Sequence, residues 1–142
     1  MRLIPAIAVL VLAHASLAHA DPSMQRLQLL SLPHADISRL IGFWQVEEMK
    51  PLKMIYEFET ATMAMHGRSE GGASTFELTL DADYRIAGEN AVWVIGTHPR
   101  PVPEGSEDSA GNPSIMGVAF TADDRATLTV SADESFTLVR VH

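Results

Sequence analysis

One serine lies in a spacing that is typical of hydrolytic enzymes. Gly67, Ser69 and Gly71 match the pattern Gly-x-Ser-x-Gly, in which the serine acts as the nucleophile. That chemistry requires a strand before the serine and a helix after it, so that a sharp turn exposes the hydroxyl. Here further small residues and then a strand-like segment follow. We therefore interpret this motif as a hairpin loop, and we expect the protein not to be an enzyme.

A second group of residues has the chemistry of a soft-metal site. Met63, Met65 and His66 combine thioether and imidazole ligands, which suit Cu(I). Alternate residues of a strand share one face, so the two methionines lie together and His66 lies on the opposite face. Methionine is also a common filler of apolar cores. We favour core packing and expect neither a metal nor a cofactor, with a soft-metal site as the alternative.

Acidic pairs offer a third possible chemistry, that of carboxylates acting as catalysts or calcium ligands. The pairs at 123–124 and 133–134 lie in predicted turns, where solvent explains them. Glu48 is different, because the alternation of Trp44 and Val46 into a core would carry it inside as well. A buried carboxylate needs a partner or a wet opening. We therefore predict that Glu48 is a polar contact in a ligand cavity.

The composition excludes several classes of site. The chain has 142 residues, no cysteine, 10 basic and 18 acidic residues, and a formal net charge of −8. Without cysteine there are no disulfides, thiolate metal sites or cysteine nucleophiles. A chain this acidic repels phosphate, so nucleic acids and anionic membrane surfaces are poor partners.

The first twenty residues have the pattern of an export signal. Arg2 gives a positive start, an apolar run covers 3–13, and Ala18-His19-Ala20 supplies small residues at a cleavage site. The apolar run is shorter than the ~20 residues that span a bilayer. We therefore expect cleavage after Ala20, no membrane span afterwards, and a periplasmic or secreted protein.

The elements that must position these residues are mostly strands. Apolar and polar residues alternate with period two, which indicates strands with one buried and one wet face. The predicted strands are 43–49, 53–60, 62–67, 74–81, 83–87, 91–97, 115–121, 126–131 and 135–141. Short polar connectors force neighbouring strands to be antiparallel. The expected fold is all-β, an antiparallel up-and-down meander of about eight strands that closes into a small barrel and so removes its edges.

Two segments do not fit the strand pattern. Residues 21–41 have weak helical spacing and a short turn that Asp36 can cap, so we predict an N-terminal segment ahead of a barrel domain at 42–142. The connector 99–114 is rich in proline and polar residues and is too long for a turn. Loops of this length are usually functional or disordered, and we favour a mobile loop, with a binding loop as the alternative.

The two ends of this predicted domain resemble lipocalins and their lipocalin-like bacterial relatives. In that family a short helical turn leads into Gly-x-Trp on the first strand, as in Gly42-Phe43-Trp44. The closing strand carries an arginine that stacks over this tryptophan, and Arg140 in 136–141 matches it. The resemblance covers about 36–142 and implies a barrel closed by Trp44 and Arg140. Independently, a charge on an apolar strand face is costly unless it is paired, and stacking lowers that cost; the alternative is that Arg140 turns to solvent.

The leading functional hypothesis is noncatalytic binding of a small, mostly apolar ligand inside the barrel. Tyr56 and Glu48 would offer polar contacts, and the lining would comprise Trp44, Val46, Met54, Tyr56, Phe58, Phe76 and Leu78. The alternative for the interior is that these side chains fill it completely. The alternative function is a periplasmic interaction module, an accessory or inhibitor protein that contacts its partner through the 99–114 loop and the 22–35 segment.

Overall fold

We describe a computed structural model, in which residues 27–49, 52–69, 71, 74–101 and 114–142 are described, without the side chains of 74 and 75. The predicted export signal and most of the 99–114 connector lie outside the described residues. No helix in the described part of the chain is long and apolar enough to cross a membrane.

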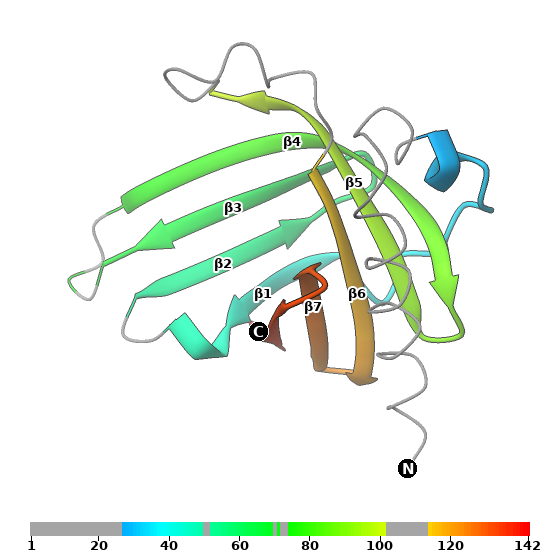
Figure 1. Ribbon diagram of the computed structural model, residues 1–142. Helices are drawn as coiled ribbons and strands as arrows, with labels where there is room; N and C mark the ends of the chain where they lie inside the picture. Colours follow the sequence, from blue (N-terminus) through cyan, green and yellow to red (C-terminus); the bar gives the residue numbers. More distant parts are fainter. Residues whose placement is uncertain (1–26, 50–51, 70, 72–73, 102–113) are drawn as a thin grey trace.

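The chain forms a closed antiparallel barrel of eight strands (Figure 1). Each strand pairs with the next in sequence, and β8 pairs with β1 to close the sheet. The strands are β1 (Gly42–Val46), β2 (Lys53–Phe58), β3 (Thr62–Arg68), β4 (Ser74–Gly88), β5 (Ala91–Arg100), β6 (Ser114–Ala122), β7 (Arg125–Ser131) and β8 (Glu134–Arg140). The predicted all-β meander barrel is confirmed.

The structure corrects the prediction of two separate strands at 74–81 and 83–87. Residues 74–88 form one strand of 15 residues, and the predicted turn at 81–83 lies inside it. The first half of β4 pairs with β3 and the second half with β5, so one long strand serves two neighbours. Asp81 and Asp83 point to arginine side chains on the outer surface rather than marking a turn.

The interior is filled by the residues that alternate inward along each strand. Its buried cluster comprises Leu40, Trp44, Val46, Tyr56, Phe58, Met63, Leu80, Tyr84, Val92, Val94, Met116, Val118, Phe120, Ala126, Leu128 and Leu138. Every strand contributes to this one cluster, as the period-two pattern requires. The chain has no cysteine and therefore no disulfides. Burial of these side chains is what stabilises the barrel.

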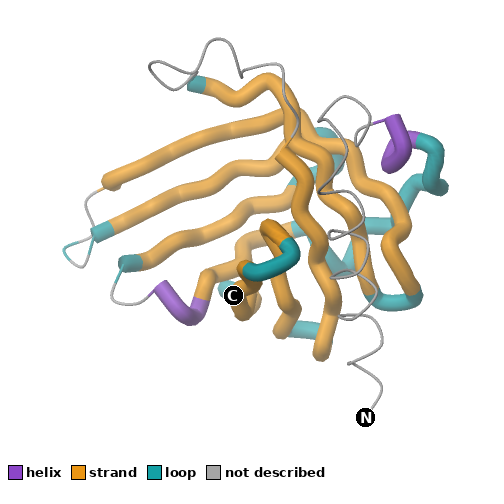
Figure 2. The backbone as a smooth tube through the Cα atoms, viewed as in Figure 1, coloured by secondary structure: helices purple, strands orange, loops and turns teal. Residues whose placement is uncertain are grey.

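The connections between strands divide the barrel into two ends (Figure 2). One end carries the segment 36–41 and the turns at 59–61, 89–90 and 123–124, and we call it the closed end. The opposite end carries the connections after β1, β3, β5 and β7, and we call it the open end. The first strand leaves the closed end, so the N-terminal segment approaches the barrel there.

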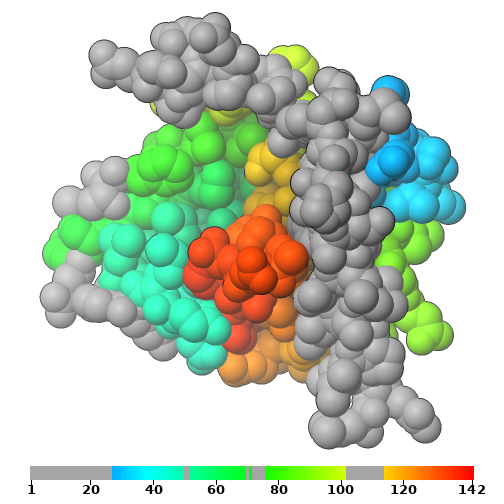
Figure 3. All heavy atoms as spheres, viewed as in Figure 1, coloured from blue at the N-terminus to red at the C-terminus, as the bar shows by residue number. Residues whose placement is uncertain are grey.

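The first described residues lie against the outside of the barrel (Figure 3). Residues 27–30 form one helical turn, in the region where weak helical spacing predicts it. Asp36 accepts a hydrogen bond from the Ser38 amide at 3.0 Å, which is the predicted cap of the following turn. Residues 27–35 thus pack on the outside of the barrel.

Candidate ligand site in the barrel

The closed end is sealed by a tryptophan and an arginine from neighbouring strands. Trp44 on β1 and Arg140 on β8 are register partners, and the Arg140 guanidinium carbon lies 4.3 Å from the centre of the Trp44 ring system. The Trp44 side chain is fully buried, and its Nε1 donates a hydrogen bond of 2.8 Å to the Leu40 carbonyl. Arg140 also donates to the carbonyls of Arg39 and Ile41. The charge is therefore both stacked and hydrogen-bonded, and it holds the 36–41 segment against the barrel.

A glycine makes this arrangement possible. Gly42 has a φ of +128°, a backbone conformation that side chains disfavour. A Cβ at this position would lie 3.0 Å from Arg140 Nη1. Gly42 therefore lets the chain turn sharply from the 36–41 segment into β1 while Arg140 passes close by.

A second arginine covers the same end, which the sequence reasoning missed. The Arg39 guanidinium carbon lies 4.5 Å from the centre of the Phe120 ring, and Arg39 Nη1 donates to Asn90 Oδ1 at 3.2 Å. Phe120 in turn packs against Trp44, with ring centres 6.1 Å apart. Arg39 could not be assigned this role in advance, because nothing in the period-two pattern brings 39 and 120 together.

The open end has a different lining. Inward-facing apolar side chains here are only partly buried, although they pack against the same core: Met54, Met65, Leu78, Val130 and Phe136. Phe76, next in the inward-facing series of β4, is 43% exposed. We call these six residues the apolar ring. Met65 and Leu78 are register partners on β3 and β4, and Val130 and Phe136 lie on the neighbouring strands β7 and β8, so the ring draws on two parts of the barrel.

Tyr56 lies between this ring and the deeper core. Its ring stacks on Phe58 with centres 6.1 Å apart and planes at 10°. Burial, reinforced by the negative charge of Glu134, raises the pKa of the Tyr56 hydroxyl above its ordinary value. The hydroxyl therefore remains protonated at neutral pH and can both donate and accept a hydrogen bond.

The prediction that Glu48 points into the interior is wrong. The strand ends at Val46, and Glu47–Met49 form a short 3-10 helix, η1, which breaks the alternation before Glu48. The exposed Glu48 carboxylate accepts hydrogen bonds of 2.7 Å from both the amide and the hydroxyl of Thr137. Partial desolvation acts to raise the pKa of Glu48, but the hydrogen bonds from Thr137 outweigh it and the pKa is lowered.

The structure thus places six of the eight predicted lining residues in or against the interior cluster, whereas Phe76 is 43% exposed and Glu48 lies outside. Trp44, Val46 and Phe58 are fully buried, and Phe58, at the end of β2, lies toward the closed end. Met54, Tyr56, Phe76 and Leu78 lie toward the open end. The predicted lining did not include three ring members, Met65, Val130 and Phe136. Their alternation with polar residues on the predicted strands could have indicated that they face inward.

The other candidate chemistries are not assembled. Met63 packs inside, whereas His66 lies on the outer face between carboxylates, 3.2 Å from Glu57 and 3.5 Å from Glu77. Among the residues described, no group of three histidine or acidic side chains could hold a metal ion. The segment around Ser69 joins β3 to β4, so a strand follows where a nucleophile motif requires a helix.

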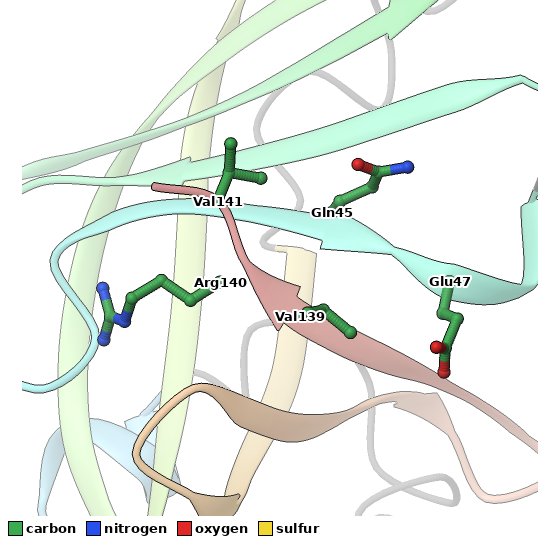
Figure 4. Close-up of a pocket in the computed structure, with 5 residues that line it drawn as sticks. All are labelled: Gln45, Glu47, Val139, Arg140 and Val141. Carbon is green, nitrogen blue, oxygen red and sulfur yellow. The ribbon is translucent and has the colours of Figure 1, made fainter.

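A pocket also lies on the outer surface (Figure 4). It is lined by Gln45 and Glu47 of the β1 region and by Val139, Arg140 and Val141 of the β8 region. The guanidinium of Arg140 points away from it (Figure 4), and Glu47 is paired with Arg125 at 3.0 Å. This pocket does not share side chains with the apolar ring.

Comparisons with protein-family models, with curated proteins and with solved structures found no match for this chain. The structure itself shows an eight-stranded antiparallel up-and-down barrel.

Proposed function

We propose that this protein is a noncatalytic, lipocalin-like binding protein that holds a small, mostly apolar molecule at the open end of its barrel. The observation that carries the proposal is the apolar ring. Six inward-facing apolar side chains remain partly exposed at one end of a barrel whose other end is closed by stacked arginines.

Partly exposed apolar side chains give a ligand its driving force. Each 100 Å² of apolar surface that a ligand removes from water contributes roughly 2.5 kcal/mol, before the cost of ordering the ligand. Met54 and Met65 have flexible side chains that adapt to differently shaped guests. The lining therefore favours ligands selected by apolarity and size.

The Tyr56 hydroxyl supplies the one polar contact that we assign to the ligand. It is a neutral group at the inner edge of the apolar ring, and it can orient a ligand that carries one hydrogen-bonding atom. Glu48 has no part in the proposal, because its carboxylate binds Thr137 on the outside.

The setting that we propose is the periplasm or the exterior of the cell. The export pattern of residues 1–20 supports it. There the ligand would be a small apolar molecule that the protein carries or stores.

A matched pair of variants tests the proposal with a fluorescent apolar probe. Leu78→Lys places a charge in the ring, whereas Thr79→Lys places the same charge on the next residue of β4. We expect saturable probe binding to the unmodified chain and to Thr79→Lys, and its loss in Leu78→Lys. Equal probe binding by the two variants would contradict the location of the site.

Native mass spectrometry of the protein purified from its own host addresses the class of ligand. A retained small-molecule mass that organic solvent removes is the expected result. The fluorescent apolar probe is then added to the protein as purified and to the protein after solvent treatment and refolding. If the probe binds to neither preparation, the proposed apolar site is contradicted.

A further inference from the structure

The inward-facing positions at the open end include one charged residue. Glu134 begins β8 and alternates with Phe136 and Leu138. Leu138 is fully buried in the interior, and Phe136 belongs to the apolar ring. Because alternate residues of a strand share one face, Glu134 continues this inward-facing series toward the opening. Glu134 is exposed, so its carboxylate lies in water at the edge of the apolar ring.

The charge of Glu134 reaches the hydroxyl that we assign to the ligand. Burial raises the pKa of the Tyr56 hydroxyl, and the negative charge of Glu134 raises it further. A Coulombic interaction weakens with distance and in water, so a carboxylate that acts on Tyr56 lies near its hydroxyl. A ligand that contacts the Tyr56 hydroxyl therefore also lies in the field of a carboxylate.

Basic side chains of the described residues do not neutralise this carboxylate. Lys53 and Arg68 are register partners on β2 and β3, at positions next to those of the inward-facing series that contains Met54, so both face outward. In the ranges that the structure describes, no lysine, arginine or histidine lies within ion-pair distance of Glu134. The negative charge at the opening is thus available to a ligand.

We propose that the open-end site takes apolar amines, with the apolar part of the ligand on the ring and its ammonium group beside the Glu134 carboxylate and the Tyr56 hydroxyl. This inference rests on the proposed binding function and adds charge to the selection by apolarity and size. An ammonium group has only donors, and both of these oxygens accept hydrogen bonds. An apolar carboxylic acid would bring a second negative charge to Glu134 and is selected against.

Three ligands of equal chain length test this selection. Short alkyl chains that end in an ammonium, a hydroxyl or a carboxylate compete at pH 7 with a neutral fluorescent apolar probe on the full chain, below the concentrations at which they form micelles. We expect the ammonium ligand to bind about fivefold more tightly than the alcohol at low salt, and the carboxylate to bind most weakly. The preference should shrink at high salt, because salt screens an exposed charge.

The outcomes separate this inference from the binding function. Equal displacement of the probe by all three ligands would overturn the selection of amines and leave apolar binding intact. A probe that binds saturably nowhere on the chain would contradict the binding function, and the inference with it.

A matched pair of variants assigns the preference to one carboxylate. Glu134→Gln and Asp133→Asn each remove one negative charge from the same hairpin, but Asp133 lies in the turn before β8 and outside the inward-facing series. Glu134→Gln should lower the affinity for the ammonium ligand to that for the alcohol, whereas Asp133→Asn should keep the preference. Equal loss in both variants would indicate a general effect of net charge and would overturn the role of Glu134.

Tyr56→Phe separates the hydroxyl from the carboxylate. Because the hydroxyl contacts the polar end of either ligand, this variant should bind the ammonium and the alcohol more weakly by a similar factor and keep the preference between them. Loss of the preference in Tyr56→Phe, with Glu134 in place, would assign the selection to the hydroxyl and contradict the proposal.

Discussion

The two ends of the barrel use the same strands in different ways. At the closed end Trp44 and Leu40 are completely buried, and Arg39 and Arg140 cover the aromatic side chains. At the open end the same alternation continues into Met54 and Leu78, which remain partly exposed. One hydrophobic pattern thus supplies a buried seal where arginines cover the end of the barrel, and partly exposed apolar side chains where they do not.

The largest expected effect comes from removing the seal. Trp44→Ala deletes a fully buried side chain and leaves Arg140 without its stacking partner. We expect a loss of about 3–5 kcal/mol in the free energy of unfolding, measured by denaturant titration. A loss below about 1 kcal/mol in the free energy of unfolding would contradict a stabilising role for the closed end.

At the closed end, a substitution of Arg140 can separate the effect of its charge from the effect of its planar shape. Arg140→Lys keeps the charge but loses the planar group that stacks on Trp44 and contacts two carbonyls. Because these hydrogen bonds and the stacking need a guanidinium, we expect a loss of about 1–3 kcal/mol in the free energy of unfolding. Unchanged thermal and denaturant stability in Arg140→Lys would show that only the positive charge matters.

At the open end a substitution should affect binding more than stability. Met65→Trp adds bulk to the apolar ring at a position that is only partly buried. We expect loss of apolar probe binding and a stability change within about 1–2 kcal/mol. The control is Ala64→Ser, next to it on β3, which should retain binding. If Met65→Trp strongly reduced stability but retained probe binding, Met65 would belong to the stabilising core and not to a binding surface.

The smallest expected effect concerns Glu48, on the outside of the open end. Desolvation acts to raise the pKa of Glu48 from 4.5, but the hydrogen bonds from Thr137 together outweigh it, so the pKa is lowered in the folded protein. Its contribution to stability is therefore present above pH 4.5 and is lost as the pH falls through the folded value.

Glu48→Gln tests this contribution by denaturant titration at several pH values. The variant should lose slightly less stability than the unmodified chain as the pH falls below 4.5. Identical pH dependence in the two proteins would indicate that the Thr137 contacts do not persist in solution.

The sequence was most informative where period two is uninterrupted. The alternation along residues 53–58 and 126–131 predicted strands and their inward faces, because a strand with one buried face must repeat every second residue. The stacking of Arg140 on Trp44 followed from the resemblance and from the cost of an unpaired charge on an apolar face. The structure places these two side chains in contact.

Prediction failed where a tertiary contact decides the local structure. Asp81 and Asp83 suggested a turn, but their carboxylates pair with arginines on the outer face, and β4 continues through them. Glu48 was placed inside because the end of β1 could not be located, and one short 3-10 helix reversed its direction. The contact of Arg39 with Phe120 joins positions 81 residues apart, which no local pattern encodes.

The most direct test of the binding account uses the methionines as reporters of depth. In the full chain with labelled methionine methyl groups, an apolar probe is titrated while each methyl resonance is followed by NMR. We predict saturable shifts at Met54 and Met65 in the apolar ring, with much smaller shifts at Met63, which is 1% exposed. Saturable binding that leaves Met54 and Met65 unperturbed, or no saturable shift at any methionine, would contradict a ligand site at the open end.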